Sequence, residues 1–346
     1  MDEQVSRAVD AQEVPPAWMV GPRSMMVDRV VPRLEFLWMP KTIQPGGKIE
    51  LVRTRQGVAP ERKRGWKVHA HRILRKDRGV EAPAGPILDL RLNAPENWAH
   101  AQIFHLPIAA MAREWLGETP TLLVTFATPA YIRRLFGHFG FPVIATERSV
   151  KGDIVTPHPS ANDALRPARR ELVRSLIADL DQRRIAGSLP SGLPAKIFVV
   201  RRNTRRLSNE AEIEAYLAAD GFVKLYPETM SVPEQLELFN AATEIVGIHG
   251  AALAPLLFRS PDAPPFQLIE ILSPGHVANS YRLMAAQVGG RYVGVRGRIK
   301  PEYIEPAYRL DRFFTTYSLA DFSIDLESLK AARAILADGA PPEIVS

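Results

Sequence analysis

The feature that most constrains the fold is a regular alternation of apolar runs and helical segments in the second half of the chain. Runs that are apolar throughout lie at 196–201, 221–227, 244–249 and 266–272, with segments of helical spacing between them. Strands of this kind that alternate with helices form a parallel sheet, which helices cover on both faces. The sequence therefore predicts a Rossmann-type α/β domain.

The helices between these runs are predicted at 209–219, 231–242 and 251–258. Ser231 and Glu234 have the spacing of a capping box, in which the hydroxyl and the carboxylate each satisfy a free amide of the first turn. Asn209 with Glu212 makes a weaker pair of the same kind. Gly221 follows the first helix, where a left-handed residue is favoured.

The first half of the chain is irregular and punctuated by proline. Apolar runs at 85–92, 121–127 and 141–147 predict buried strands. The segment 101–117 has helical spacing, and its Pro107 implies a kink or a late start. The predicted order is strand, helix, strand, helix, strand.

A loop rich in Gly, Pro, Ser and Asn at 150–167 is the predicted boundary, and a helix is expected after it at 168–186. We expect an N-terminal domain at 1–165 and a C-terminal Rossmann-like domain at 166–305. The tail at 306–346 is expected to pack back across the domains.

Composition excludes several kinds of site. The 346 residues include no cysteine, which rules out disulfides, Cys-ligated zinc, iron–sulfur clusters and a thiol nucleophile. The N-terminus begins acidic and has no apolar core of a secretory signal, and no apolar stretch approaches the roughly 18 residues that a membrane-spanning helix needs. We expect a cytoplasmic protein.

The formal net charge of +6 predicts an anionic partner. The densest basic stretch, at 61–79, interleaves Arg and Lys with Trp66, His69 and His71, which suits nucleic acid or an anionic membrane surface. The other interpretation is a solvated strand and loop near a phosphate-binding cleft.

Ligands of an open parallel sheet bind beyond the carboxyl ends of its strands, where helix N-termini present free amides. The run "EIVGIHGA" brings a strand to His249, lets a ligand approach the backbone at Gly250 and begins a helix at Ala251. A phosphate would be well placed there. A structural histidine beside an ordinary turn glycine is the alternative.

Two other strand exits carry charge. Arg201 and Arg202 end one strand, and Arg205 and Arg206 follow in the loop, so that their guanidiniums could neutralise a diphosphate; pairing with nearby acids is the alternative. Glu270 lies in an apolar strand and is expected to hold ribose hydroxyls or to form an internal salt bridge. No dinucleotide fingerprint, P-loop or metal-binding motif occurs in the sequence, so no metal or cofactor is expected.

The run 197–258, followed by 266–272, resembles the core of glycosyltransferase family 61. The matching positions, in order, are Arg201, Arg206, Asn209, Glu210, Gly221, Phe222, Glu228, Gln235, Gly247, His249, Gly250, Ala251, Leu253, Phe258 and Glu270. The first half matches more loosely through Asn97, His100, Leu106 and Pro107 of "NWAHAQIFHLP". Phe104 occupies the position of an acid that is the natural candidate for the general base.

The resemblance implies a GT-B fold, in which two Rossmann-like, doubly wound domains face across a cleft, and an inverting, metal-independent hexosyl or pentosyl transfer. The donor is expected to be a UDP-sugar and the acceptor a glycan, in bacterial surface polysaccharide synthesis. The implied donor site has Arg201, His249 and the Gly250–Ala251 amides at the diphosphate, with Arg206 assisting and Glu270 at the ribose. His100, Glu96 and His105 are the groups that can replace the missing acid, and His100 is preferred.

Two alternatives follow from the same residues. A catalytically impaired nucleotide-sugar-binding protein would keep the donor site and lack a base, as Phe104 suggests. A nucleic-acid-binding protein would use the 61–79 stretch. Peripheral contact with an anionic inner-membrane surface is compatible with the charge.

Overall fold

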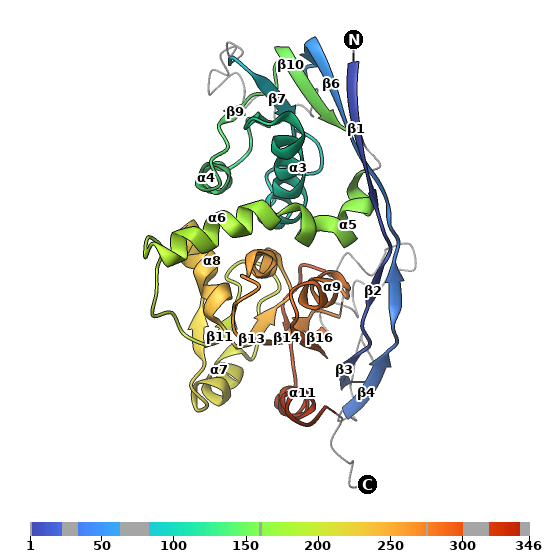
Figure 1. Cartoon of the computed structure of the whole chain (residues 1–346). Coiled ribbons are helices and arrows are strands. Elements are labelled where there is room, and N and C mark those ends of the chain that lie inside the picture. Colours follow the sequence, from blue (N-terminus) through green and yellow to red (C-terminus); the bar gives the residue numbers. More distant parts are fainter. Residues whose placement is uncertain are drawn as a thin grey trace. The chain divides into compact units, whose positions relative to one another are not determined.

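The computed structural model describes residues 2–22, 34–62, 83–158, 161–274, 276–299 and 318–339 (Figure 1). The chain forms two compact units, the first comprising Met1–Gln12 and Ile43–Leu189 and the second Glu13–Thr42 and Pro190–Ser346. Two short strands, β2 (Gln12–Val14) and β5 (Thr42–Gln44), lie where the chain passes from one unit to the other. These bounds differ from the expected 1–165 and 166–305.

The difference between the expected domain bounds and the observed units has two structural causes. The helix α5 (Ala161–Leu172) packs against the first unit's strand β6 and helix α3, so the division falls after it, at Leu189. The strand β3 (Ala17–Pro22) pairs with a strand of the second unit, which brings the segment 13–42 into that unit.

The second unit contains a seven-stranded sheet in the order β12-β11-β13-β14-β15-β3-β4. All its strands are parallel except β4, which is antiparallel to β3. The strands not yet bounded are β4 (Leu34–Met39), β11 (Lys196–Val199), β12 (Val223–Leu225), β13 (Glu244–Ile248), β14 (Gln267–Leu272) and β15 (Arg291–Arg296). The predicted parallel α/β sheet is thus confirmed.

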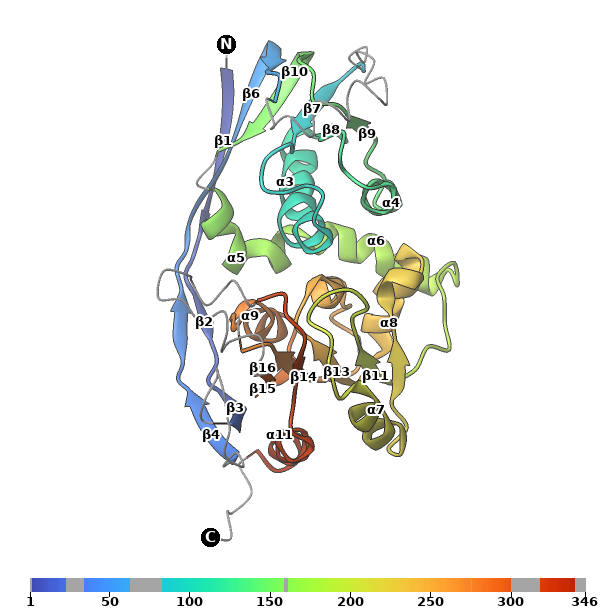
Figure 2. The same cartoon turned by 180° about the vertical axis from the view of Figure 1, so that it is seen from behind.

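Helices cover both faces of this sheet (Figures 1 and 2). On one face lie α7 (Glu210–Ala218) and α11 (Leu326–Asp338), and on the other lie α8 (Val232–Ala241), the 3₁₀ helix η3 (Ala251–Phe258) and α9 (Ser280–Gln287). A short 3₁₀ turn, η2 (Pro227–Thr229), follows β12, and β16 (Arg298–Ile299) pairs with β17 (Phe322–Ser323). Buried side chains of β11, β13, β14 and β15 pack with α7 and α11 in one core.

Most of the residues predicted to begin or end helices do so in the structure. The capping box of Ser231 and Glu234 is present, and Gly221 has φ 81°. Asn209 instead donates a side-chain hydrogen bond to Glu212 without capping the backbone. The segment 251–258 is a 3₁₀ helix rather than the expected α-helix, and Pro255 lies within it.

The first unit contains a six-stranded sheet in the order β1-β6-β10-β7-β8-β9. The predicted strands β7 (Pro86–Asp89), β8 (Thr121–Val124) and β9 (Val143–Ala145) are present and parallel to one another and to β10 (Val150–Pro157). Two long antiparallel strands, β1 (Asp2–Val9) and β6 (Gly47–Ala59), complete it. The loop expected at 150–167 was therefore a wrong prediction, because β10 and the start of α5 occupy most of it.

The helices of the first unit differ in detail from expectation. The segment predicted as one helix at 101–117 consists of a π-helix, η1 (Ala101–His105), and α3 (Leu106–Leu116), with Pro107 in the first turn of α3. It follows a short helix, α2 (Trp98–His100), and α4 (Ala130–His138) lies further along. The helix expected at 168–186 is two helices, α5 and α6 (Arg174–Ile185), separated at Val173.

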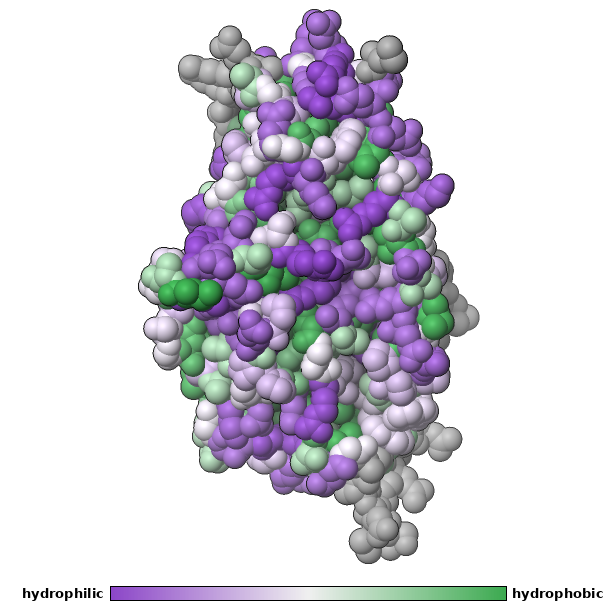
Figure 3. Space-filling model, viewed as in Figure 1, coloured by the Kyte–Doolittle hydropathy of each residue, from purple (hydrophilic) through white to green (hydrophobic). Residues whose placement is uncertain are grey.

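No helix in the described parts of the chain is long and apolar enough to cross a membrane. On the face shown in Figure 3, green hydrophobic residues form separate spots among purple hydrophilic ones. Single exposed apolar residues of this kind are normal on protein surfaces.

Candidate functional site

Polar side chains gather at the carboxyl edge of the second unit's sheet. The strands β11, β13 and β14 are parallel neighbours, so their carboxyl ends lie at one edge. Arg201 and Arg205 follow β11, His249 follows β13, and His276 lies in the loop after β14. Ligands of parallel sheets bind at this edge.

A buried hydrogen-bonded chain holds His249. Its Nδ1 is bonded to the carboxylate of Glu270, and the Tyr292 hydroxyl donates to the other carboxylate oxygen at 2.7 Å. Glu270 is fully buried, and His249 is 6% exposed. Burial of the Tyr292 hydroxyl, followed by the charge of Glu270, raises the pKa of the phenol well above its usual value, so it stays a donor. Because a carboxylate only accepts, Nδ1 carries the proton and Nε2 is left for a ligand.

The contacts of Glu270 favour a different role from the expected one at the ribose. Both carboxylate oxygens already accept hydrogen bonds, and no part of the residue is exposed. Of the two alternatives that the sequence left open, the internal pairing is the one present in the structure, with His249 as the partner.

Two half-buried guanidiniums converge on the carbonyl oxygen of His249. Arg201 Nη1 and Arg205 Nη1 each lie 3.4 Å from that oxygen. Arg201 also donates to the Thr204 carbonyl at 2.8 Å and to its hydroxyl at 3.0 Å, and Arg205 donates to the Ser318 carbonyl at 2.5 Å. All these acceptors are neutral, and within the described ranges neither arginine forms an ion pair with a carboxylate.

Burial lowers the pKa of both guanidiniums, and the charge of Arg201 lowers that of Arg205 further. A guanidinium nevertheless stays charged in a protein. The site therefore holds two adjacent positive charges that repel each other, and an anion would relieve this repulsion.

Gly250 allows Arg201 to lie against the backbone. A Cβ at this position would be 1.7 Å from Arg201 Nη1 and 2.9 Å from its Cζ. The Gly250 carbonyl accepts a hydrogen bond from the Tyr281 hydroxyl at 2.6 Å, and Ala251 begins η3 immediately afterwards. The glycine is thus required by the close approach of the guanidinium.

The other two arginines of the predicted cluster have acidic partners. Arg206 is paired with Asp321 at 2.5 Å. Arg202 lies 3.8 Å from Glu228 and stacks over the ring of Tyr226. The structure therefore brings together Arg201 and Arg205 rather than all four guanidiniums.

The acceptor-side candidates lie in the first unit, after the carboxyl end of β7. Asn97 caps α2, and the Nδ1 of His100 donates to the Asn93 carbonyl at 2.9 Å, so Nδ1 carries a proton and Nε2 is not engaged by this bond. The ring of Phe104 meets that of His100 edge to face, with centroids 5.2 Å apart. Glu96 is partly buried in the same loop.

His105 is placed differently from His100. It is 2% exposed, and neither ring nitrogen makes a hydrogen bond of normal geometry. Burial, followed by the charge of His100, lowers its pKa to about 4. His105 is therefore a neutral, buried residue at physiological pH.

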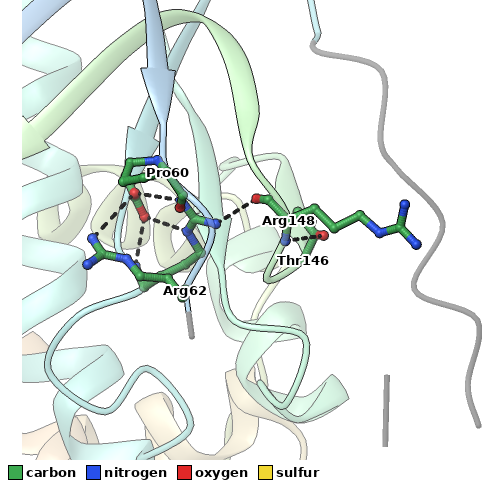
Figure 4. Close-up of polar contacts among 6 residues, drawn as sticks. Pro60, Arg62, Thr146 and Arg148 are labelled. Atoms are coloured by element: carbon green, nitrogen blue, oxygen red, sulfur yellow. Dashed lines mark hydrogen bonds and ion pairs between the residues drawn. The ribbon is translucent and has the colours of Figure 1, made fainter. Parts of the chain in front are cut away.

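A buried ion pair fixes the start of the loop that carries these residues. Arg91 donates to both carboxylate oxygens of Asp89 at 2.9 Å, and also to the carbonyls of Pro60 and Arg148. Figure 4 shows the Arg148 side chain extending away from this cluster, while Arg62 lies beside it. Since every partner is internal, the cluster holds the loop after β7 in place.

The basic stretch at 61–79 falls almost wholly outside the described residues, which include only its first two, Glu61 and Arg62. In the described parts of the chain, no group of three or more His, Asp or Glu side chains is placed to hold a metal ion.

Sequence reasoning missed His276, Tyr281 and Tyr292. The His249 ring lies 4.7 Å from the ring of His276 and 5.4 Å from that of Tyr281. His276 could have been noticed because "LSPGH" follows a predicted strand, as "VGIHGA" does. The two tyrosines carry no local signal.

Comparison with known proteins identifies the family. The sequence matches the family described as Glycosyltransferase 61 over residues 26–265, more than half of the chain. It is also 28% identical over 120 residues to a β-1,2-xylosyltransferase, XAX1, of Oryza sativa subsp. japonica. That match covers 34% of this chain, and the chain spans about a fifth of the relative, 21% of its length. Together with the arginine and histidine site at the sheet edge, the match shows that the chain belongs to glycosyltransferase family 61.

Proposed function

We propose that the chain transfers a sugar, with inversion, from a UDP-sugar to a hydroxyl of a glycan, and that the second unit binds the donor diphosphate. The observation that carries the proposal is the pair Arg201 and Arg205. Two half-buried guanidiniums without carboxylate partners among the described residues lie at the ligand-binding edge of a parallel sheet. Guanidiniums suit a diphosphate because their donors match its oxygens.

In this proposal the site stabilises the leaving group. As the bond between the anomeric carbon and the diphosphate oxygen breaks, its electrons move to the diphosphate. Fixed donors aimed at developing charge lower the barrier, since they need no reorganisation during the reaction. Arg201, Arg205 and the amides at Gly250–Ala251 would supply these donors in place of a metal ion, and the His249 ring would lie against the diphosphate.

Glu270 would act as a positioning residue. Its carboxylate and the Tyr292 hydroxyl fix the tautomer and orientation of His249. Arg206 would assist indirectly, because its pairing with Asp321 ties the loop before α7 to the segment that also supplies the Ser318 carbonyl to Arg205.

His100 is the proposed base of the first unit. Its Nδ1–H is held by the Asn93 carbonyl, so its Nε2 lone pair can take the proton of the acceptor hydroxyl as the hydroxyl oxygen attacks the anomeric carbon. His105 is buried and is therefore a weaker candidate. Glu96 lies in the loop with His100 and is the remaining candidate.

The finer assignments are further parts of the proposal. The relative's name makes UDP-xylose the first donor to test. A GT-B arrangement of the two units, a role in bacterial surface polysaccharide synthesis and a cytoplasmic location with peripheral inner-membrane contact stay predictions.

The test is turnover with a panel of UDP-sugars and glycan acceptors, in the presence and absence of a chelator. We expect UDP release that depends on the acceptor, that chelation leaves unchanged and that His100→Gln reduces. The matched control is His158→Gln, which changes an exposed histidine at the end of β10. Proton NMR coupling at the new linkage reports its anomeric configuration, and retention would contradict the proposed inversion.

Binding of UDP-sugars without any turnover would instead support the catalytically impaired alternative, which Phe104 favours. If no UDP-sugar binds, the proposed donor site is refuted.

A further inference from the structure

His276 borders the candidate donor site but has no part in the function proposed above. It lies in the loop after β14, where its backbone amide donates to the Ser273 carbonyl at 2.9 Å. Its ring is half-buried and lies 4.7 Å from the ring of His249, with 49° between the ring planes. The residue is thus a titratable group at the edge where a ligand would bind.

The charged groups around His276 favour its neutral form. Arg201 and Arg205 face it from the loop before α7, and His249 faces it from the end of β13. Burial, followed by His249, Arg205 and Arg201, lowers its pKa to about 4. His276 is therefore neutral at physiological pH while no anion is bound.

The remaining titratable groups at this edge do not offset these effects. The Tyr281 hydroxyl, from α9, donates its proton to the Gly250 carbonyl. The carboxylate of Glu270 is engaged by His249 and Tyr292. Among the described residues, no carboxylate contributes to the shift in the pKa of His276.

A bound diphosphate would reverse this balance. It would neutralise Arg201 and Arg205 and place negative charge beside the imidazole. An opposite charge within about 4–6 Å typically raises the pKa of a cation by about 1–3 units. The pKa of His276 would then be higher in the complex than in the free protein.

We propose that His276 takes up a proton from the solvent when a nucleoside diphosphate binds, and that its imidazolium becomes a third cation of the site beside Arg201 and Arg205. This inference rests on the proposed function, because it needs a diphosphate at that site. The proton comes from water or buffer, and no covalent bond changes. The same imidazolium would stabilise the charge that builds on the departing diphosphate.

The test is calorimetric titration with UDP-xylose and UDP-glucose, each in two buffers of different ionisation enthalpy. The diphosphate of a UDP-sugar is esterified at both ends and has no proton that titrates near neutrality, so protons taken up belong to the protein. At about pH 5.5 we expect an uptake of between about one fifth and one proton per site, and at about pH 8 almost none. Affinity should be higher at the lower pH, by about fourfold for a shift of about 2 units and by about thirtyfold for a shift of about 3 units.

Two variants and a control identify the residue. His276→Phe keeps a ring against His249, and His276→Gln keeps a polar side chain; in both, the uptake should vanish and affinity should become nearly independent of pH. His158→Gln, which removes an exposed histidine of the first unit, should retain the uptake. Because a variant could fail to fold, histidine ring signals of the wild-type protein should also show one pKa rising when UDP-sugar is added.

The outcomes separate the two claims. UDP-sugar binding without proton uptake, or uptake that persists in both His276 variants, overturns the role of His276 and leaves the donor site intact. If no UDP-sugar binds at either pH, the proposed function fails and the role of His276 fails with it.

Discussion

Gly250→Ala should displace Arg201 while leaving its charge in place. The backbone at Gly250 has φ 162° and ψ −179°, an extended conformation that alanine adopts without strain. The three atoms nearest to the added Cβ all belong to Arg201, and the closest, Nη1, is 1.7 Å away. Reaching an ordinary contact of 3.4 Å requires the guanidinium to retreat by about 1.7 Å, which breaks its bonds to Thr204.

The magnitude follows from the bonds that Arg201 could no longer make. A hydrogen bond from a charged group is worth about 1.5–3 kcal/mol, so UDP affinity should fall by about 10- to 100-fold. Overpacking of this kind costs about 1–3 kcal/mol of unfolding free energy. Both effects arise from one contact and should therefore disappear together when the contact is removed.

A double-mutant cycle with Arg201→Ala makes the measurement. Calorimetry gives the UDP affinity and thermal unfolding gives the stability of the wild type, both single variants and the double variant. The two losses of affinity should not add, and the double variant should bind UDP about as well as Arg201→Ala alone. It should also recover most of the stability that Gly250→Ala loses.

Additive effects in this cycle would refute the reasoning, because they would show that Gly250 acts independently of Arg201. Gly137→Ala is the matched control. Gly137 lies within α4, and a Cβ there would meet nothing within 4 Å. This variant should change neither UDP affinity nor its dependence on Arg201.

Three further predictions follow from the same structure. Glu270→Gln should lower turnover by at least about tenfold while the fold persists, because the amide no longer fixes the His249 tautomer; unchanged pH–rate profiles and turnover would contradict this. Ser231→Ala should reduce unfolding free energy by about 1 kcal/mol through loss of the capping box, as measured by denaturant unfolding. Burial lowers the pKa of His105 from 6.5 to about 4. As pH falls, the unfolded chain therefore binds this proton before the folded protein does, and the free energy of unfolding should fall by up to about 3 kcal/mol between about pH 6.5 and about pH 4. Thermal unfolding across that pH range should show that His105→Gln removes most of this dependence of stability on pH. An unchanged pH dependence in the variant would contradict the reasoning.

The parallel sheet of the second unit could be predicted because helices cover both its faces. Its strands are then apolar throughout, as in "IFVV" and "EIVGI", and turn signals separate them. The strands β1, β6 and β10 could not be predicted in the same way. In β6, buried Ile49 and Leu51 alternate with the more exposed Glu50 and Val52, so no continuous apolar run marks the strand.

The candidate donor site was predictable where its residues end a strand. Arg201 and His249 do so in the sequence itself, and parallel topology then brings them together. The partners of Glu270 depend on register, which the sequence does not specify locally. Glu270 pairs with Gly294, and Tyr292, two residues earlier on β15, reaches the carboxylate across the space that this glycine leaves.

The difference between the two pairs of arginines was also beyond local reasoning. Arg206 finds Asp321 more than one hundred residues later in the chain, whereas Arg205 turns towards the carbonyl of His249. Arg205 has φ 55°, a left-handed conformation that is uncommon outside glycine. Which guanidiniums lack a carboxylate is therefore a property of the tertiary fold.

The most direct test of the central claim is calorimetric titration of UDP into the wild-type protein and the variant Arg201→Gln/Arg205→Gln. Each guanidinium should contribute about 1.5–3 kcal/mol to diphosphate binding, so the double variant should bind UDP at least about 100-fold more weakly. Arg291→Gln, which removes an exposed arginine at the amino end of β15, on the opposite edge of the same sheet, should bind as the wild type does. Equal UDP affinity in the wild type and the double variant would contradict the assignment of this edge as the donor site.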